Sequence, residues 1–501
     1  MVVETRSGKL RGAERRGVLA FRGIPYAAPP TGARRFRAPV PAAPWPGVRE
    51  ATAPGPGAPQ RAGVLFGPFT RAAGPGATAE DCLTLDLWTP RADGARRPVL
   101  VWIHGGAFVM GAGSALAYTG ASLARRGDVV VVTLNYRLGA LGFLQLGDLA
   151  RGDPFDSNLG LRDQLAALAW VRDNVAAFGG DPANVTVFGE SAGAMSVGAL
   201  LGAPRARGLF ARAIAESGAA HNTASRESAA RVAATFLAAL GLAPAEAERL
   251  REVPVSALLE AQFATVARLG LAYGTLPFEP AVDGDLLPEH PLDAIARGSA
   301  RGVPFLVGTN RDEWNLFLLA DAKARALGED GLLRRYARSL GPDAAEHAHG
   351  LYREALPRAS PRARWGAYQT HRVFTAPAAR LGELQAAHAP SYAYLFTWSP
   401  PLVRRRVGAC HGLEVPLVFG TFRHPLLRGF YLGGASATAA TLQRAWLAFA
   451  RTGCPETGGS WLTVSAANRA PHVLDGDDRG ALDAFERVRG FWAERGHGSR
   501  V

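Results

Sequence analysis

Gly189-Glu190-Ser191-Ala192-Gly193 is the most informative stretch of this chain, because it combines a hydroxyl nucleophile with the small residues needed to expose it. It follows an apolar run at residues 185–188 and precedes a helix-compatible run at residues 194–197. In a sharp strand-to-helix turn the central residue is strained, and flanking glycines let neighbouring backbone pass without a Cβ clash. The pattern therefore predicts that Ser191 projects clear of a sheet.

Short β-rich runs alternate with helical patterns along the chain, which is typical of a mostly parallel sheet with helices on both faces. Strands are predicted at residues 98–104, 129–135, 185–189, 211–216, 304–308 and 392–397. Residues 159–178 carry apolar side chains at helical spacing, and the following Gly179-Gly180-Asp181-Pro182 is expected to end that helix. We expect an α/β protein with one domain spanning residues 1–501.

Two Ala/Leu/Glu/Arg-rich stretches, near residues 228–269 and 321–389, are predicted to be helical insertions. Ligands bind at the carboxyl edge of open α/β sheets, and we expect both insertions to cover that edge over the active site. A Pro/Gly-rich loop at residues 55–76 is expected to contribute as well.

Composition excludes several classes of protein. The chain has 48% hydrophobic and 20% charged residues, enough for a substantial core. Its net charge of +13 suggests nucleic acid as a partner, but the arginines are scattered and the densest run, residues 404–406, has no interleaved aromatic side chain. We therefore expect no nucleic-acid partner. Oligomeric state is not readable from these patterns.

The three cysteines, Cys82, Cys410 and Cys454, have no metal-ligand spacing and predict neither a metal site nor a disulfide framework. The amino terminus lacks the charged-then-apolar plan of a secretory signal. No apolar run approaches the roughly 20 residues that cross a bilayer. We expect a cytoplasmic protein with no membrane span.

A serine hydroxyl needs a histidine base and a carboxylate that orients this base. In α/β-hydrolases the acid and then the histidine follow the serine in chain order. His411 lies in a small-residue loop after the predicted strand at residues 392–397, and it is the candidate base. Asp312 and Glu313 follow the strand at residues 304–308, and composition does not choose between them, since either could cap the next helix.

The oxyanion of a tetrahedral intermediate needs backbone N–H donors. The strand at residues 98–104 runs into His104-Gly105-Gly106-Ala107, where small residues leave amides unshielded. Together with the amide of Ala192 these would form a three-donor hole. A phosphate-binding loop is disfavoured, because neither G-x-G-x-x-G nor a terminal Lys-Ser/Thr is present.

The chain resembles the type-B carboxylesterases, the family of bacterial para-nitrobenzyl esterases, animal carboxylesterases and cholinesterases. The resemblance covers nearly the whole chain in family order. It rests on the segments at residues 23–27, 35–36, 80–83, 104–108, 135–139, 178–182, 189–193, 283–285, 308–313 and 411–414. It implies an α/β-hydrolase fold and a serine carboxylic-ester hydrolase.

The resemblance also implies particular roles. It places the triad acid on Glu313 rather than Asp312, and it places the oxyanion donors on Gly106, Ala107 and Ala192. It further implies a supporting set of Glu190, Ser217 and Glu414 around the nucleophile and the histidine. Without this resemblance, the simpler interpretation is that Ser217 is a turn residue and that Glu414 is a solvated residue at the start of a helix.

Two departures from the family limit what it implies. No cysteine precedes Cys82, so the disulfide that several secreted relatives form there cannot form. The loop at residues 61–80 has no tryptophan, whereas cholinesterases use an indole in that loop to bind a quaternary ammonium by cation–π attraction. Choline esters are therefore not expected as substrates.

The predicted reaction needs no metal or organic cofactor. Ser191 attacks an ester carbonyl, His411 takes the serine proton, Glu313 holds the imidazole, and water then hydrolyses the acyl-enzyme. Small to medium apolar esters are the expected substrates. Hypothetical wall residues of an apolar cleft, each of which could equally be a core residue, are Phe66, Phe69, Leu276, Phe317 and Phe374.

Three alternatives remain at this stage. Some relatives are catalytically silent cholinesterase-like binding or adhesion modules, although Ser191, Glu313 and His411 are all retained here. Cys410 could act as a nucleophile beside His411, but adjacent residues rarely present their side chains to one another, and a buried small hydrophobe is the simpler interpretation. Lipase, thioesterase and lactonase activities use the same triad and are not ranked by the sequence.

Overall fold

Strands and helices alternate along the chain in the computed structural model, which describes residues 1–61, 76–147, 155–269, 276–456, 459–475 and 479–495. The strands are β1 (Val2–Thr5), β2 (Gly8–Arg11), β3 (Ala13–Arg15), β4 (Val18–Pro25), β5 (Val48–Glu50), β6 (Thr84–Thr89), β7 (Arg97–Ile103), β8 (Val130–Leu134), β9 (Gly180–Glu190), β10 (Arg212–Glu216), β11 (Phe305–Asn310), β12 (Ser391–Phe396) and β13 (His472–Leu474). The longer helices are α2 (Ala121–Gly127), α4 (Leu159–Asn174), α5 (Ala192–Gly202), α6 (Arg226–Ala239), α7 (Val255–Leu269), α10 (Glu329–Leu340), α11 (Pro342–Ala355), α12 (Pro361–Thr370), α13 (Ala376–Ala386), α16 (Ala435–Thr452) and α17 (Arg479–Glu494). Shorter helices are α3 (Gly139–Phe143), α8 (Pro291–Ala296), α9 (Asn315–Leu318), α14 (Arg404–Val407) and α15 (Val415–Phe419).

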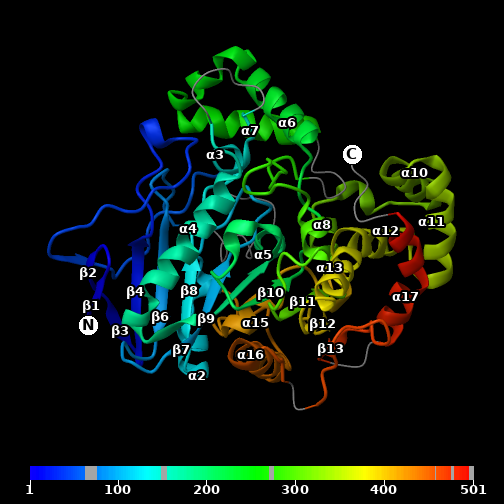
Figure 1. The fold of residues 1–501 in the computed structure, drawn as a ribbon. Helices are drawn as coiled ribbons and strands as arrows, with labels where there is room; N and C mark the ends of the chain where they lie inside the picture. The colour runs from blue at the N-terminus through cyan, green and yellow to red at the C-terminus, as the bar shows by residue number, and fades with distance from the viewer. Residues whose placement is uncertain (62–75, 148–154, 270–275, 457–458, 476–478, 496–501) are drawn as a thin grey trace.

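A 10-stranded sheet in the order β13-β12-β11-β10-β9-β7-β8-β6-β4-β3 forms the centre of the molecule (Figure 1). The strands from β13 to β8 are parallel, whereas β6, β4 and β3 add antiparallel pairings at one side. The six predicted strands correspond to β7 through β12, which confirms the expected α/β class with a mostly parallel sheet. Their ends differ by a few residues, most at β9, which begins at Gly180 rather than at residue 185.

Side chains that alternate along each strand build a separate core on each face of the sheet. On one face Val99, Val101 and Ile103 of β7 pack in a cluster that includes residues of α4, α5 and α13. On the other face Leu100 and Trp102 pack with residues of α2, α15 and α16. The sheet is therefore rigidly held between two helical layers, and its carboxyl edge provides a fixed base for the loops that follow the strands.

Helix α4 shows how the local signals determine an element. It starts at Leu159 and continues through a 3₁₀ turn at Val175–Phe178. Gly179 then takes φ of +81°, a left-handed conformation that glycine adopts without a Cβ penalty. The helix ends at the glycine predicted to end it.

The predicted insertion at residues 228–269 forms α6 and α7, and α7 lies against α3 at the carboxyl end of β8. The side chain of Gln262 on α7 accepts a hydrogen bond from the Ala140 N–H at 2.9 Å. The predicted stretch at residues 321–389 divides into two parts. Helices α10, α11 and α12 form a helical lobe with α17, which has its own core, whereas α13 packs directly on β11 and β12. Helix α13 thus belongs to the layer that covers the sheet, because Ala378 and Leu381 join the main core.

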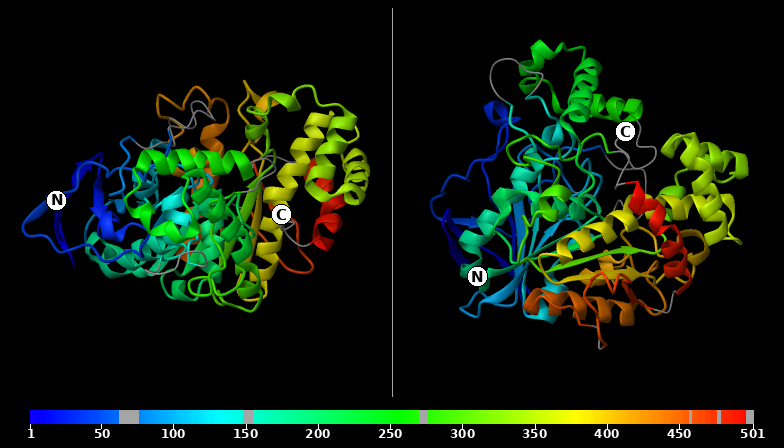
Figure 2. Two further views of the ribbon diagram at one scale, coloured as in Figure 1. Left: turned by 90° about the horizontal axis from the view of Figure 1, so that it is seen from above. Right: turned by 45° about the vertical axis from the view of Figure 1, so that its right-hand side comes forward.

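The helical lobe and the small sheet of β1, β2 and β5 lie at opposite ends of the molecule (Figures 1 and 2). In the described part of the chain, no individual helix has the length and apolar character to cross a membrane. One bent pair, Arg226–Ala239 with Pro244–Arg251, meets those two criteria jointly, by length and composition only.

Candidate active site

Ser191 occupies the sharp turn between β9, which ends at Glu190, and α5, which begins at Ala192. Its φ of 57° and ψ of −126° are strained for a residue with a side chain, and such strain persists only where surrounding structure enforces it. The N–H of Ser191 donates to the carbonyl of Glu216 at 2.9 Å, and a Cβ on Gly193 would come within 2.0 Å of the Ile103 carbonyl oxygen. The motif therefore adopts the predicted turn, and only glycine fits where α5 approaches β7.

His411 and Glu313 reach Ser191 from two other loops at the carboxyl edge of the sheet. His411 Nε2 lies 2.8 Å from Ser191 Oγ, and His411 Nδ1 lies 2.7 Å from Glu313 Oε2. Glu313 follows β11 and is fully buried, and its Oε1 accepts a hydrogen bond from the Asn310 N–H at 2.7 Å. The three side chains form a continuous hydrogen-bonded line from hydroxyl to carboxylate.

Asp312, the competing acid, has a different task in the structure. Its Oδ2 accepts hydrogen bonds from the Ala409 N–H at 2.8 Å and from the Arg311 guanidinium at 2.8 Å. These bonds tie the loop after β11 to the loop that carries His411. Asp312 therefore supports the backbone while Glu313 contacts the imidazole.

The loop after β7 carries Gly106 and Ala107, which both take positive φ, +116° and +55°. A Cβ on Gly106 would lie 2.1 Å from the Met110 carbonyl oxygen, so this tight loop requires glycine there. Among the described residues, the N–H groups of Gly106 and Ala107 have no hydrogen-bond acceptor. The N–H of Ala192 is the first of α5 and has no acceptor within the helix. All three predicted donors thus belong to backbone that leaves an N–H available.

His104, at the start of this loop, supports it from below and was not predicted from the sequence as a functional residue. Its Nδ1 lies 2.8 Å from the Gly105 carbonyl, and its ring stacks on Tyr136, whose hydroxyl donates to the His104 carbonyl at 2.8 Å. Burial lowers the pKa of His104 to about 4, so the ring is neutral at pH 7. His104 therefore fixes the shape of the loop without adding charge.

A group of buried carboxyl side chains surrounds the histidine. Glu190 Oε1 lies 3.1 Å from His411 Nε2, on the same side as Ser191 Oγ. Glu414 Oε1 lies 3.5 Å from Ser217 Oγ, and Glu414 Oε2 accepts from the amide of Asn310. Asn310 was not predicted. Asn310 donates to Glu313 through its backbone N–H and to Glu414 through its side-chain amide. It therefore links two loops, and no local sequence pattern predicts this link.

These carboxyl groups alter the acidity of one another and of His411. Burial alone would lower the pKa of His411, but the carboxylates of Glu190 and Glu313 outweigh it and raise that pKa to about 9. Burial raises the pKa of Glu190 to about 7, despite the opposing effect of His411. Burial, with Glu190 and Glu313 nearby, raises the pKa of Glu414 to about 8. The site therefore stabilises the protonated form of His411.

Two of the five predicted wall residues contact the histidine. The ring centroid of Phe374 lies 4.7 Å from that of His411, and the ring of Phe317 lies 5.4 Å from it. Leu276 packs, half-buried, against the main core cluster. Phe66 and Phe69 lie outside the described residues. An aromatic wall therefore flanks the imidazole.

Cys410, the alternative nucleophile, is buried behind His411. Burial, with Glu313 and Glu414 nearby, raises the pKa of the Cys410 thiol far above its usual range. A thiol that does not ionise is a poor nucleophile. The structure thus disfavours cysteine chemistry at this position.

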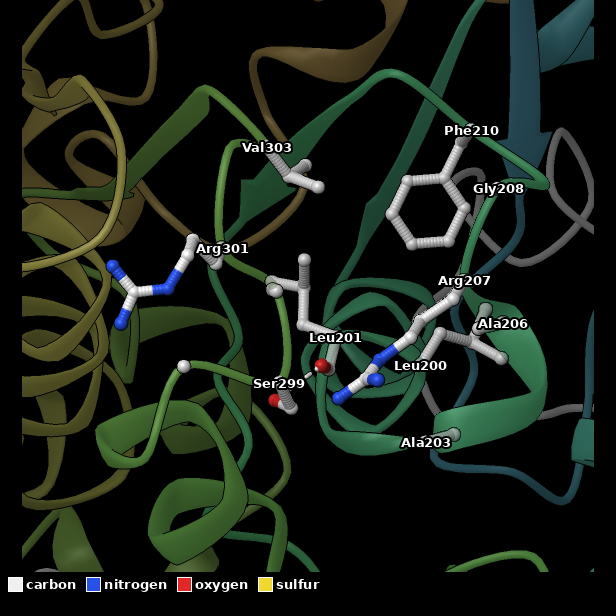
Figure 3. A pocket seen from close by; sticks show the side chains of 12 residues that line it. Leu200, Leu201, Ala203, Ala206, Arg207, Gly208, Phe210, Ser299, Arg301 and Val303 are labelled. Carbon is white, nitrogen blue, oxygen red and sulfur yellow. Dashed lines mark hydrogen bonds between the residues drawn. The ribbon is translucent and has the colours of Figure 1, made fainter.

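A cavity of about 470 Å³ lies elsewhere, between the end of α5 and the loops that precede β10 and β11. In Figure 3 the guanidinium of Arg207 lies near Ser299, with Phe210 at the other side of the cavity. Since α5 begins beside Ser191 and reaches this cavity only at its opposite end, the cavity is separate from the nucleophile. Within the described ranges, no group of three His, Cys, Asp or Glu side chains could hold a metal ion.

Comparison with known proteins agrees with this geometry. The family model described as "Carboxylesterase family" matches residues 1–479. The chain belongs to the carboxylesterase family. It is 40% identical over 483 residues to the para-nitrobenzyl esterase of Bacillus subtilis, covering 95% of each chain, and 36% identical over 501 residues to the phenmedipham hydrolase of Pseudarthrobacter oxydans, covering 97% of each.

Solved carboxylesterases show the same fold. A carboxylesterase of Geobacillus stearothermophilus superimposes with a TM-score of 0.85 at 42% identity, covering 96% of this chain and 99% of that one. A PNB esterase gives a TM-score of 0.82 at 40% identity, covering 97% and 100%. The predicted resemblance, the α/β-hydrolase fold and the assignment as a carboxylic-ester hydrolase are thereby confirmed.

The cysteines of this carboxylesterase are unpaired among the described residues. Cys82 is buried as a free thiol, and Cys410 and Cys454 are also free. Burial raises the pKa of the Cys82 thiol far above its usual range, so it is chemically inert in the folded enzyme.

Proposed function

We propose that this carboxylesterase hydrolyses small to medium apolar carboxylic esters through an acyl-enzyme formed on Ser191. The observation that carries the proposal is the line Ser191 Oγ, His411 Nε2, His411 Nδ1 and Glu313 Oε2, with contacts of 2.8 and 2.7 Å. In this line His411 accepts the Ser191 proton as the oxygen attacks the ester carbonyl, and Glu313 stabilises the resulting imidazolium.

The N–H groups of Gly106, Ala107 and Ala192 donate hydrogen bonds to the carbonyl oxygen as negative charge develops on it. Donors that are already oriented stabilise this charge without reorganising during the reaction. His411 then gives its proton to the departing alcohol. In the second half of the reaction His411 takes a proton from water, which attacks the acyl carbonyl, and it returns a proton to Ser191 Oγ as the acid leaves. When ionised, Glu190 and Glu414 favour the imidazolium intermediate, and Ser217 contacts Glu414.

The substrate class rests on the aromatic wall and on the relatives. Phe317 and Phe374 flank His411, and apolar rings favour apolar acyl or alcohol groups. The printed name of one relative, a para-nitrobenzyl esterase, describes esters with an aromatic group, and this supports the same class here. A silent adhesion module is disfavoured, since such a module has no need for a serine held in strained backbone against a histidine.

Replacing Ser191 with Ala tests this function directly. We expect turnover of para-nitrophenyl butyrate to fall by about 10⁴ to 10⁶, as in triad knockouts of other hydrolases. A fluorophosphonate probe should label the wild-type enzyme but not S191A. As a matched control, S299A removes a remote serine hydroxyl, which donates to the Leu201 carbonyl, and should retain both labelling and turnover. Near-normal turnover by S191A would refute the proposal.

A further inference from the structure

Phe374 reaches His411 from an irregular segment of backbone. A π-helix at His371–Thr375 separates α12 from α13, and Phe374 lies within it. Here the Phe374 ring approaches His411 and stacks on Phe317 with centroids 6.3 Å apart. π-Helices are rare and are less favourable than regular helix, so tertiary contacts must hold one in place.

Helix α11 contacts this π-helix by a hydrogen bond, and helix α17 contacts it through one ring and is also bonded to α11. Trp492 Nε1 donates a hydrogen bond to the Tyr352 hydroxyl at 3.1 Å, and the Tyr352 hydroxyl lies 3.0 Å from His371 Nδ1. Since the tryptophan donates to the hydroxyl oxygen, the hydroxyl proton is free to be donated to the histidine. Burial lowers the pKa of His371 to about 3, which keeps the ring neutral and its Nδ1 able to accept. The three buried residues come from α17, α11 and the π-helix.

Two more contacts strengthen this connection. The ring of Phe485, also on α17, meets the edge of His371 with centroids 5.2 Å apart. The hydroxyl of Thr370, just before the π-helix, accepts a hydrogen bond from the Trp314 N–H at 3.1 Å. Trp314 directly follows Glu313 and its ring lies 4.6 Å from that of Phe317. The π-helix therefore connects the helical lobe to both the acid and the aromatic wall.

We propose that Trp492 and Tyr352 are positioning residues that hold the π-helix so that Phe374 remains against His411, and that this hydrogen-bonded chain sets the selectivity of the enzyme for acyl length. The proposal rests on the proposed ester hydrolysis at Ser191. Neither residue touches the reacting atoms, and both act through the placement of the Phe374 ring.

The test compares Y352F and W492F with the wild-type enzyme on para-nitrophenyl acetate and para-nitrophenyl hexanoate. Y352F deletes one oxygen, and W492F deletes the N–H donor together with part of the indole ring. Melting temperatures within a few degrees of wild type will show that both variants fold. In this proposal the acyl chain lies along the Phe374 ring, so a hexanoyl chain contacts that ring and the much shorter acetyl group does not. We expect the hexanoate-to-acetate ratio of kcat/KM to fall threefold or more in each variant, mainly through KM for the hexanoate.

Y336F is the matched control. Tyr336 lies in the same lobe, its ring 6.1 Å from that of Tyr352, but its hydroxyl has no hydrogen-bond partner among the described residues. Y336F should leave the ratio within 1.5-fold of wild type, on the order of experimental error. In an F374A background, Y352F should change the ratio no further, because its effect passes through that ring.

An unchanged ratio in Y352F and W492F, with wild-type hydrolysis of both esters, would overturn the positioning role and leave the proposed function intact. A full effect of Y352F in the F374A background would also overturn it. By contrast, absence of ester hydrolysis in the wild-type enzyme would refute the proposed function itself.

Discussion

His411 lies between two carboxylates with different relations to the chemistry. Glu313 faces Nδ1 at 2.7 Å, whereas Glu190 faces Nε2 at 3.1 Å, the nitrogen that accepts the serine proton in the proposed mechanism. An ionised Glu190 stabilises the imidazolium but offers nothing to the neutral ring, since both Nε2 and the carboxylate are then acceptors. Glu190 therefore raises the pKa of His411, and in the proposed mechanism we expect this to reduce activity near neutral pH.

E190Q should move the acid limb of the pH profile to lower pH. A general base works only when neutral, so activity is lost as pH falls through its pKa. The carboxylates raise the pKa of His411 to about 9 against the effect of burial, and removing one of them lowers it. The profile of kcat/KM between pH 5 and 10 measures this shift. E4Q, at an exposed position on β1, should leave the limb in place, and an acid limb at equal or higher pH in E190Q would contradict the assignment.

The sequence singles out individual residues where one motif suggests a role, and the structure shows where those residues lie. Ser191 and Ala192 follow from a local pattern, and the fixed chain order of α/β-hydrolases directs attention to His411. Asp312 and Glu313 could not be separated by composition, because adjacent carboxylates differ only in the direction of their side chains, and the resemblance was needed. Asn310 and His104 act through contacts with distant loops, and such contacts leave no trace in local spacing.

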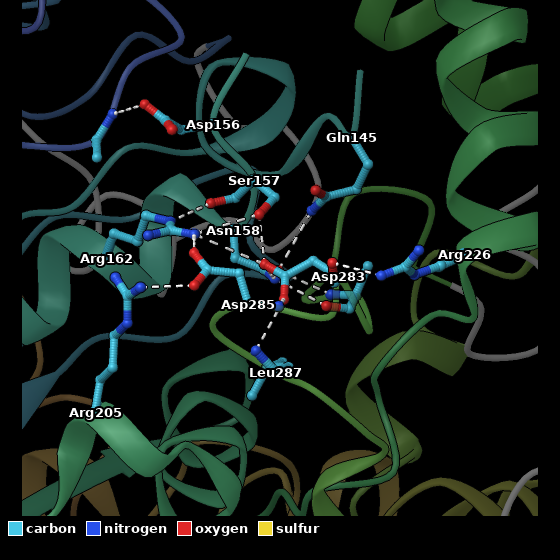
Figure 4. A network of polar contacts seen from close by, with 12 residues as sticks. Gln145, Asp156, Ser157, Asn158, Arg162, Arg205, Arg226, Asp283, Asp285 and Leu287 are labelled. Carbon is cyan, nitrogen blue, oxygen red and sulfur yellow. Dashed lines mark hydrogen bonds and ion pairs between the residues drawn. The ribbon is translucent and has the colours of Figure 1, made fainter. Parts of the chain in front are cut away.

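Among the structural elements, the loop that carries Asp283 links the start of α4 to the start of α6. The Asp283 carboxylate accepts hydrogen bonds from Ser157, from the Asn158 amide at 2.7 Å, and from the N–H groups of Asp285 and Leu287 at 2.9 Å each (Figure 4). Its side chain is only 7% exposed. Removal would take away an acceptor from four donors, three of them part-buried.

D283A should lower the free energy of unfolding by about 3 kcal/mol, the usual effect of breaking a buried polar network. D285A is the matched control. Asp285 pairs with Arg162 and Arg205, but its side chain is 51% exposed, and exposed ion pairs contribute about 1 kcal/mol or less. Urea denaturation measures both. If D283A and D285A lowered the free energy of unfolding equally, the burial of Asp283 would not account for its contribution to stability.

Secondary-structure elements differ in how well the hydrophobic pattern predicts them. The six strands β7 to β12 are largely apolar and mostly buried on both faces, and all six could be predicted from hydrophobicity. The π-helix at His371–Thr375 could not, because it depends on a hydrogen bond from Tyr352 of α11, which is itself bonded to Trp492 of α17. Likewise β13 is only three residues long, and its pairing with β12 depends on the completed sheet.

For the molecule as a whole, buried ionisable groups make stability depend on pH in two opposing ways. Burial raises the pKa of Glu190 to about 7, of Glu414 to about 8 and of Glu216 well above its ordinary range, so the folded state holds more protons on these groups than the unfolded state above pH 4.5. Their contribution to stability is therefore lost as pH rises through those folded pKa values. Burial lowers the pKa of His104 to about 4 and of His371 to about 3, so their contribution grows as pH rises to 6.5.

Below pH 6.5 the histidines and the carboxyl groups change the free energy of unfolding in opposite directions. Above pH 6.5 only the loss of stability from the carboxyl groups remains. The pKa of His411, raised to about 9, adds to that loss, because a raised histidine stabilises the fold while it is protonated and ceases to do so as pH rises through 9. We expect the free energy of unfolding, measured by urea denaturation, to fall from pH 6.5 to pH 9. E414Q removes one buried carboxyl that must ionise in this window and should reduce the fall, whereas E354Q, at an exposed position, should not. A fall of the same size in E414Q, or a stability that rises toward pH 9, would mean that the buried carboxyl groups ionise in the folded enzyme as readily as in water.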